Sequence, residues 1–233
     1  MAVTLYDYMS AVSVSTSEIS ILTGTTTLTD STDAGIYRLW LDVGAASLVK
    51  GDEFIVKIKE KCLSGGTQRI LDQRIISHTD GNIAVFPPVM LLHGWNMTIQ
   101  KISGTDRNWT AAIRKSGSCT QYNSLSAVSI STSEISLLSG TTTLQANTTE
   151  GVYQVIVDGI TSAVAKSDQF RFRCMEKVLS GGTQREVFPV EIYGAQSEMI
   201  YTPMMDLLEG WDYTLIKLAG TDRSFTASVR KAA

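Results

Sequence analysis

The first candidates for chemistry in this sequence are two copies of one ten-residue phrase. EKCLSGGTQR occupies residues 60–69, and EKVLSGGTQR occupies residues 176–185. Adjacent glycines beside a threonine hydroxyl could hold a phosphate group, but a phosphate-binding loop also requires a lysine and a helix after its glycines. In this phrase neither a lysine nor a helix follows the glycines, and no nucleophile stands beside a base. We therefore interpret it as a turn between two strands.

The cysteines and histidines do not form a metal-binding or catalytic pattern. The sequence contains three cysteines and two histidines, and no pair of them has the spacing of zinc ligands. An odd number of cysteines also argues against a disulfide framework. We therefore predict a protein with no cofactor, no bound metal and no catalytic residues, and we expect that it is not an enzyme.

The two phrases belong to a longer internal repeat, in which each residue matches the residue 116 positions later. Gly24 matches Gly140, Trp95 matches Trp211, and the alignment needs no gap between residues 10 and 115. A repeat unit of this length predicts two folded domains rather than a solenoid. The expected organisation is a first domain at 1–115, a short polar link at 116–125 and a second domain at 126–233.

The elements that would position these phrases are strands, because apolar and polar residues alternate through each copy. In EFIVKIKEK the residues Phe54, Val56 and Ile58 share one face, and the matching residues of the second copy are also apolar. This period of two is typical of half-buried strands, and no segment has a helical period. Seven or eight short strands per copy predict an all-β chain of two tandem antiparallel β-sandwich domains, with a jelly roll favoured over an immunoglobulin-like topology.

Two kinds of glycine-containing hairpin recur in both copies. The Ser-Gly-Gly-Thr segment joins one pair of strands, where adjacent glycines permit the positive φ angles of a tight turn. The phrase GTDR joins a second pair of strands. The glycines that we assign to these structural hairpins are Gly65, Gly66, Gly104, Gly181, Gly182 and Gly220.

Two glutamates stand at positions where a strand would point them into the core. Glu60 and Glu176 have the same parity as the inward residues that precede them, and a buried carboxylate is costly unless it is paired. The arginines that recur in both copies predict internal Glu–Arg pairs. Alternatively, the strand ends or bulges before Glu60, and the carboxylate is solvated. The candidate members of these ion pairs are Glu60, Glu176, Arg69, Arg107, Arg185 and Arg223.

One large apolar side chain points away from the predicted core. Trp40 lies on the outward parity of its strand and is replaced by Ile156 in the second copy, which indicates a surface that another protein or domain covers. Outward positions also differ between the copies at Arg38 and at Phe188. The candidate interaction surface therefore comprises Trp40, Ile156, Arg38 and Phe188.

Composition argues against several other classes of protein. The net charge of −3 gives no electrostatic basis for binding nucleic acid. No apolar run approaches the ~18 residues that cross a bilayer, and the N-terminal sequence lacks the basic and apolar regions of a signal peptide. We therefore expect no nucleic-acid partner, no membrane partner and synthesis in a cytoplasm.

Two long phrases of the second copy resemble those of a known family. EKVLSGGTQR is followed about 35 residues later by a tryptophan, the phrase GTDR and a closing Arg-Lys. This combination resembles a family of small β-proteins encoded by tailed bacteriophages, some of which look like capsid decoration (cement) proteins. The chain departs from that family by being a tandem pair, and the resemblance covers both copies.

The resemblance implies a structural role in a virus particle. It implies a location on the capsid surface after synthesis in the host cytoplasm, with the major capsid protein or another virion protein as the partner. It also implies a homo-oligomer on the shell. It transfers no catalytic residues.

Other functions remain open at this point. A β-sandwich can also be the receptor- or carbohydrate-binding module of a phage fibre, although the tryptophans at 95, 109 and 211 have inward parity and so belong to a core. A double-jelly-roll capsid protein is a further alternative, for which about 110 residues per copy is small. An enzyme is the least favoured class, because the polar residues do not converge on any pattern.

Overall fold

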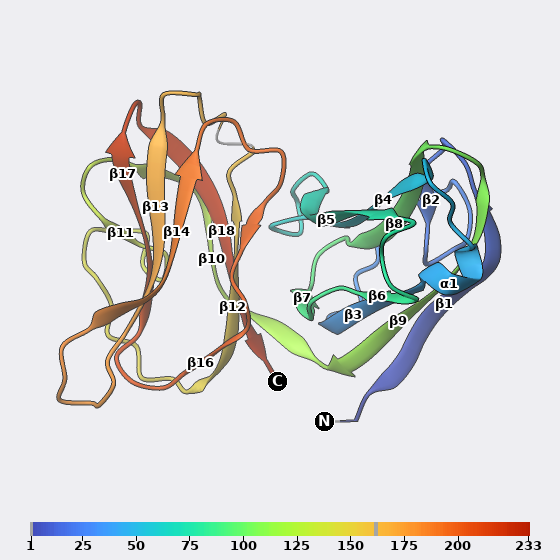
Figure 1. Cartoon of the computed structure of the whole chain (residues 1–233). Coiled ribbons are helices and arrows are strands. Elements are labelled where there is room, and N and C mark those ends of the chain that lie inside the picture. The colour runs from blue at the N-terminus through green and yellow to red at the C-terminus, as the bar shows by residue number, and fades with distance from the viewer. Residues whose placement is uncertain (1, 161–162) are drawn as a thin grey trace. The chain divides into compact units, whose positions relative to one another are not determined.

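The computed structural model describes residues 2–160 and 163–233, which form almost entirely β-structure (Figure 1). The chain divides into two compact units, unit 1 (Met1–Thr120) and unit 2 (Gln121–Ala232), and Ala233 groups with unit 1. The helix α1 (Val43–Ala46) has four residues, and none of the described helical segments could cross a bilayer. The prediction of an all-β chain with two tandem β-sandwich domains is confirmed.

Unit 1 consists of two antiparallel sheets. The five-stranded sheet has the order β1-β9-β3-β6, with β7 also paired to β3, and the four-stranded sheet has the order β2-β8-β4-β5. The strands are β1 (Thr4–Val14), β2 (Ile19–Ser20), β3 (Gly35–Asp42), β4 (Glu53–Glu60), β5 (Arg69–Ser77), β6 (Ile83–Val85), β7 (Val89–Leu91), β8 (Asn96–Ser103) and β9 (Arg107–Gly117).

Unit 2 repeats this arrangement. Its five-stranded sheet has the order β10-β18-β12-β15, with β16 also paired to β12, and its four-stranded sheet has the order β11-β17-β13-β14. The strands are β10 (Cys119–Ile130), β11 (Ile135–Ser136), β12 (Gly151–Asp158), β13 (Gln169–Glu176), β14 (Arg185–Tyr193), β15 (Ile200–Tyr201), β16 (Met205–Leu207), β17 (Asp212–Ala219) and β18 (Arg223–Ala232).

Both units have the strand order of a jelly roll. In unit 1, β6 and β7 act as one strand that is broken by Pro87 and Pro88, since proline cannot donate to a sheet ladder. Counted in this way, one sheet contains strands one, eight, three and six, and the other contains strands two, seven, four and five. This order winds two Greek keys around a single core. Pro203 breaks the matching strand of unit 2 between β15 and β16.

The same aromatic cluster fills the core of each unit. The rings of Trp95 and Tyr37 lie 4.5 Å apart in unit 1, and those of Trp211 and Tyr153 lie 4.4 Å apart in unit 2. All four side chains are completely buried, as is Trp109. The inward parity of the three tryptophans therefore predicted their burial correctly.

The polar segment at 116–125 is strand rather than the predicted link. β9 continues to Gly117 and β10 begins at Cys119, so the boundary between the units falls within this run, after Thr120. β10 lies at the edge of its sheet, beside β18. Edge strands commonly carry polar side chains, and this composition made the segment resemble a linker.

Candidate functional site

The Ser-Gly-Gly-Thr phrases form hairpin turns, but only the second glycine of each is needed, and for a different reason from the one predicted. The N–H of Gly66 donates to the carbonyl of Leu63 at 2.9 Å, and Gly182 makes the matching bond in unit 2 at 2.8 Å. None of the four glycines has a positive φ, so that expectation is wrong. A β-carbon on Gly66 would instead lie 3.1 Å from the Leu63 carbonyl, whereas Gly65 and Gly181 have open space around them.

The GTDR hairpins are anchored on a buried aspartate. Gly104 and Gly220 both have φ of 85°, which favours glycine. In unit 1, Asp52 accepts hydrogen bonds from the N–H of Thr105 at 2.8 Å and from Nε of Arg107 at 2.7 Å. Because the loop amides and then the guanidinium stabilise its charged form, the pKa of Asp52 is lowered.

Unit 2 contains the same anchor. Asp168 accepts from the N–H of Thr221 at 2.9 Å and from Nε of Arg223 at 2.7 Å, and these contacts lower its pKa to about 2. Arg107 and Arg223 therefore form internal ion pairs as predicted, but with aspartates instead of glutamates. The recurrence of Asp52 as Asp168 was the signal that could have identified these partners.

The two glutamates hold loops through backbone amides. Glu60 is completely buried, and its Oε1 accepts from the N–H of Leu92 at 2.5 Å and of His93 at 3.0 Å. Glu176 is half-buried and accepts from the N–H of Leu208 at 2.7 Å. Of the alternatives that the sequence left open, a buried carboxylate is observed for Glu60.

Arg69 and Arg185 stand opposite the two glutamates in the strand register. The Nε of Arg69 has no acceptor in the part of the chain that the structure describes, and Arg185 is exposed. The partners shown for Glu176 are loop amides, so the carboxylate is not anchored by one of the predicted Glu–Arg pairs.

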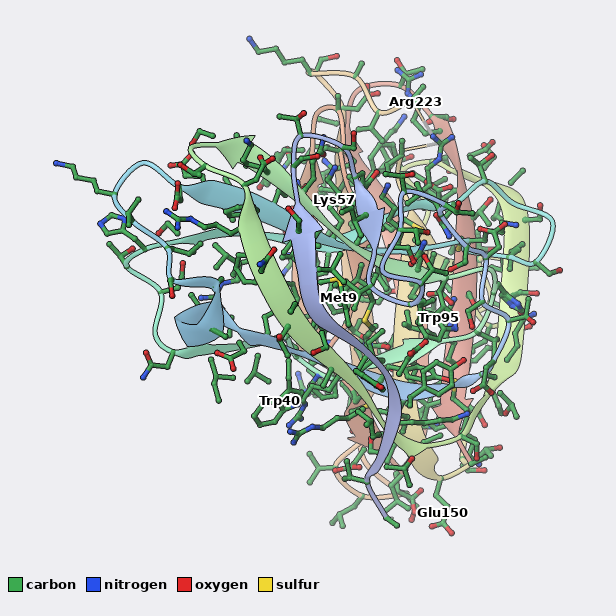
Figure 2. All side chains as sticks on the ribbon, turned by 90° about the vertical axis from the view of Figure 1, so that its right-hand side faces the viewer. Met9, Trp40, Lys57, Trp95, Glu150 and Arg223 are labelled. Atoms are coloured by element: carbon green, nitrogen blue, oxygen red, sulfur yellow. The ribbon has the colours of Figure 1, made fainter. Side chains whose placement is uncertain are left out.

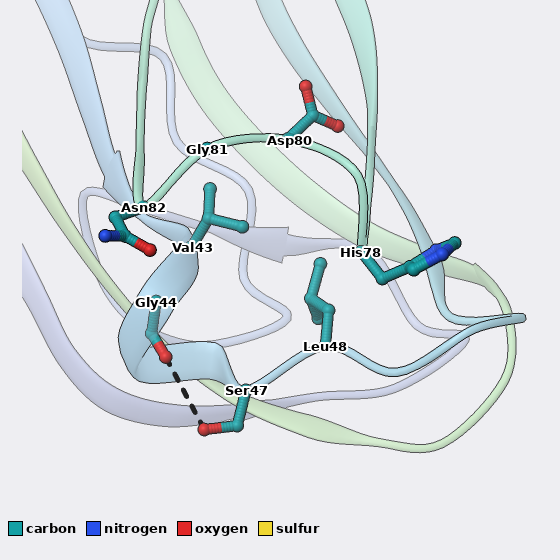
Figure 3. Close-up of a pocket in the computed structure, with 8 residues that line it drawn as sticks. All are labelled: Val43, Gly44, Ser47, Leu48, His78, Asp80, Gly81 and Asn82. Carbon is teal, nitrogen blue, oxygen red and sulfur yellow. Dashed lines mark hydrogen bonds between the residues drawn. The ribbon is translucent and has the colours of Figure 1, made fainter.

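A polar pocket of about 180 Å³ beside α1 is the place where chemistry could be sought in unit 1 (Figure 3). Ser47, His78, Asp80 and Asn82 line it. Figure 3 shows that the side chains of His78 and Asp80 point in different directions. Asp80 is already paired with Arg74 at 2.5 Å. Since an acid, a base and a nucleophile do not converge in this pocket, its geometry does not support a reaction.

The outer face of the five-stranded sheet of unit 1 carries a surface that we call the Trp40 surface, defined by Trp40, Ile83, Ala112 and Arg114. Figure 2 shows Trp40 at the margin of the strands. The guanidinium carbon of Arg114 lies 4.0 Å from the centre of the Trp40 ring, a cation–π contact. Ile83 is 58% exposed. These residues line a pocket of about 160 Å³ that also includes Asp42.

The Trp40 surface has an unsatisfied polar atom. The indole Nε1 of Trp40 is shielded from solvent and has no hydrogen-bond acceptor among the described residues. A shielded donor without a partner costs free energy. The half-buried ring is therefore held in this surface at a cost in free energy.

The predicted interaction residues do not share one kind of environment. Arg38 is exposed on the same strand as Trp40, whereas Ile156, for which we expected a covered surface, is completely buried. Phe188 is half-buried, and its side chain packs against the core of unit 2. Its partner in the strand register is Cys174, which is buried in that core, and directly opposite residues lie on the same side of a sheet.

A second surface, which the sequence reasoning missed, lies at one end of unit 2. It consists of four aliphatic side chains, and we call it the apolar end of unit 2. Their exposed fractions are 90% for Val178, 73% for Leu179, 53% for Leu208 and 41% for Leu144. The amide of Gln184 joins the three segments by donating to the carbonyls of residues 145 and 210. An exposed apolar cluster of this kind marks a site of interaction.

Recurrence between the copies was the signal for this surface. The leucines at 144, 179 and 208 match leucines at 28, 63 and 92. Unit 1 differs from unit 2 at two of the surrounding positions, because Cys62 stands in place of Val178 and Asp30 in place of Ala146. Asp30 pairs with Lys61 at 2.6 Å. The end of unit 2 has lost that carboxylate and is the more apolar of the two.

Comparison with known proteins identifies no family. The sequence matches no protein-family model and no curated protein. Among solved structures, the PBSX exported protein XepA is similar with 9% identity and a TM-score of 0.32, over 100% of this chain and 86% of that one. A peptide-N(4)-(N-acetyl-β-D-glucosaminyl)asparagine amidase has 10% identity and a TM-score of 0.32, over 100% and 96%. A triple-jelly-roll turret protein of an archaeal virus has 12% identity and a TM-score of 0.28, over 86% and 53%. Likenesses this distant transfer no function.

Proposed function

We propose that the protein is a non-enzymatic structural protein of a virus particle, and that it is a decoration protein that binds the outside of a bacteriophage shell and stabilises it. The observation that carries the proposal is the presence of two exposed apolar surfaces, the Trp40 surface and the apolar end of unit 2, on rigid jelly rolls. The resemblance of the repeated phrases to those of phage decoration proteins supports a virion protein, such as the major capsid protein, as the partner.

The duplicated architecture suits this role. A shell presents the same junction many times, and a rigid sandwich that bridges a junction adds buried surface at each one. Two units in one chain raise the effective concentration of the second contact once the first has formed. The chain can therefore hold a shell together through contacts that are individually weak.

The test uses phage shells that lack the protein. Purified chain is added over a range of concentrations, the shells are pelleted, and the bound protein and the temperature of shell disruption are measured. Saturation at a fixed number of chains per shell, together with raised heat resistance, supports the proposal. Binding that never saturates, or no binding, contradicts it.

Two variants make this test specific. Trp40→Ala should weaken binding by about tenfold or more, because aromatic residues at the centre of an interface contribute most of its affinity. Leu218→Ala is the matched control, since Leu218 is also an exposed aliphatic residue but lies in β17 and belongs to neither surface. Equal binding by Trp40→Ala and the unmodified chain would exclude the Trp40 surface from the contact.

The jelly-roll order of both units favours one other candidate, a double-jelly-roll capsid protein. A capsid protein assembles a closed shell from its own copies, whereas a decoration protein needs a shell to bind. Electron microscopy of the purified chain under assembly conditions separates the two. Closed shells made of this chain alone would replace the decoration proposal, and retention on a glycan array without shell binding would indicate a fibre module.

A further inference from the structure

We propose that the Trp40 surface of one copy binds the apolar end of unit 2 of a second copy, so that the protein associates head to tail. This inference rests on the proposed function in one respect, because on a shell the two surfaces would meet those of neighbouring copies and so strengthen the binding of each chain. It concerns contacts between copies of the chain, however, and can be tested in solution without a shell.

The sizes of the two surfaces are compatible. The pocket of the Trp40 surface has a volume of about 160 Å³, and a cavity of about 150 Å³ accepts a molecule the size of benzene. Val178 and Leu179 are the most exposed large apolar side chains of the described residues. They project from a hairpin whose turn is closed by the 2.8 Å bond from Gly182 to the Leu179 carbonyl. Because the hairpin is already ordered, docking would immobilise little additional chain.

The charges around the two surfaces also match. The lysine of unit 1 that is equivalent to Lys177 is paired with an aspartate, but unit 2 has Ala146 at the position of that aspartate. Lys177 thus lacks this carboxylate, and the backbone places it beside Glu209. The pocket contains Asp42 and Arg114. One basic and one acidic group on each side allow Lys177 to meet Asp42 while Glu209 meets Arg114, which would fix the orientation of the contact.

Among the residues that the structure describes, each chain offers one surface of each kind. Ile156, which stands at the position of Trp40 in unit 2, is completely buried. Cys62, which stands at the position of Val178 in unit 1, is only 4% exposed. A contact between unlike surfaces is heterologous, so repeated association produces a ring where the rotation closes and an open chain where it does not.

The test measures the mass of the free protein by sedimentation velocity at concentrations up to about 1 mM, since a small interface gives weak association. Two variants each remove one surface: Trp40→Ala removes the pocket, and Leu179→Glu places a charge on the apolar end. Both positions are at least partly exposed, so neither change removes a core contact. Leu218→Glu, at an exposed aliphatic position of β17, is the control for an added charge.

The decisive experiment mixes the two variants. The unmodified chain and the control should form species larger than the 25.4 kDa chain, and each variant alone should remain at 25.4 kDa. A mixture of Trp40→Ala and Leu179→Glu retains one intact pocket and one intact apolar end, so it should form a species of twice the chain mass and nothing larger.

Three outcomes would overturn the inference. They are an unmodified chain that stays at its monomer mass at 1 mM, a Trp40→Ala variant that associates like the unmodified chain, and a mixture that forms no dimer. None of these results depends on shells. Failure of head-to-tail association can therefore be distinguished from failure of the decoration proposal, which is decided by pelleting with shells.

Discussion

Asp212 should give unit 2 a pH dependence that unit 1 lacks. Its side chain is completely buried and accepts hydrogen bonds from Oγ of Ser136 at 2.8 Å and from the N–H of Gln145 at 2.7 Å. Unit 1 has Asn96 at the matching position, where Ser20 makes the same hydroxyl contact at 2.9 Å. Because burial opposes ionisation, the pKa of Asp212 is raised from 3.8 to about 6.

The raised pKa means that folded unit 2 retains a proton that the unfolded chain releases. The stability contributed by this proton is fully present below about pH 4 and is lost as the pH rises through about 6. The rise of the pKa from 3.8 to about 6 corresponds to about 3 kcal/mol of unfolding free energy. We therefore expect the stability of unit 2, measured relative to the variant Asp212→Asn, to fall by about 3 kcal/mol between pH 4 and pH 7.

Urea unfolding between pH 4 and pH 7, followed by hydrogen exchange of peptides from residues 121–232, measures this difference. Asp212→Asn should lower stability at every pH if its amide nitrogen faces the N–H of Gln145, so the slopes with pH are compared rather than the absolute values. The matched variant Asn96→Asp should give unit 1 the pH dependence of stability that Asp212→Asn removes from unit 2. Equal slopes for the unmodified chain and Asp212→Asn would refute the reasoning.

Two further predictions concern the loops that shape each unit. Glu60→Ala should lower the free energy of unfolding in urea by about 1–3 kcal/mol, because two loop amides lose their acceptor in a buried site. Glu176→Ala should lower it by less, since that carboxylate is half-buried. An equal loss for the two variants would contradict this account. Gly104→Ala should cost at least about 2 kcal/mol in thermal unfolding, because φ is 85° and the new β-carbon would lie 2.2 Å from Asp52. Gly65→Ala has open space and should be close to neutral, and a similar loss at both glycines would show that the turn geometry is not the cause.

The core of each unit could be predicted from the sequence because alternation is a local property. Phe54, Val56 and Ile58 occupy one face of β4 whatever that face packs against, and all three are buried. Agreement between the two copies strengthened this inference, since matching inward positions remained apolar. The number of domains followed from the repeat of 116 residues, and the jelly-roll class followed from the number of alternating strands.

The partners of charged residues could not be predicted in this way. Arg107 recurs in both copies, but its partner Asp52 stands 55 residues away in a loop, and only the pairing of β4, β8 and β9 with their neighbours brings them together. Phe188 was assigned to the surface for a similar reason. Its position depends on the bulge between Cys174 and Met175, which changes the register of β14 and cannot be seen in one strand.

The differences between the units include the positions that a directional contact needs. Tyr37 and Tyr153 keep the same aromatic core, because a change there would affect the packing of a whole unit. In contrast, the position of Trp40 carries a different residue in unit 2, and the apolar end of unit 2 has valine and alanine where unit 1 has cysteine and aspartate. Two identical units would offer the same surfaces twice and leave the direction of association undefined. Confining the pocket to unit 1 and the most apolar hairpin to unit 2 defines that direction within one chain.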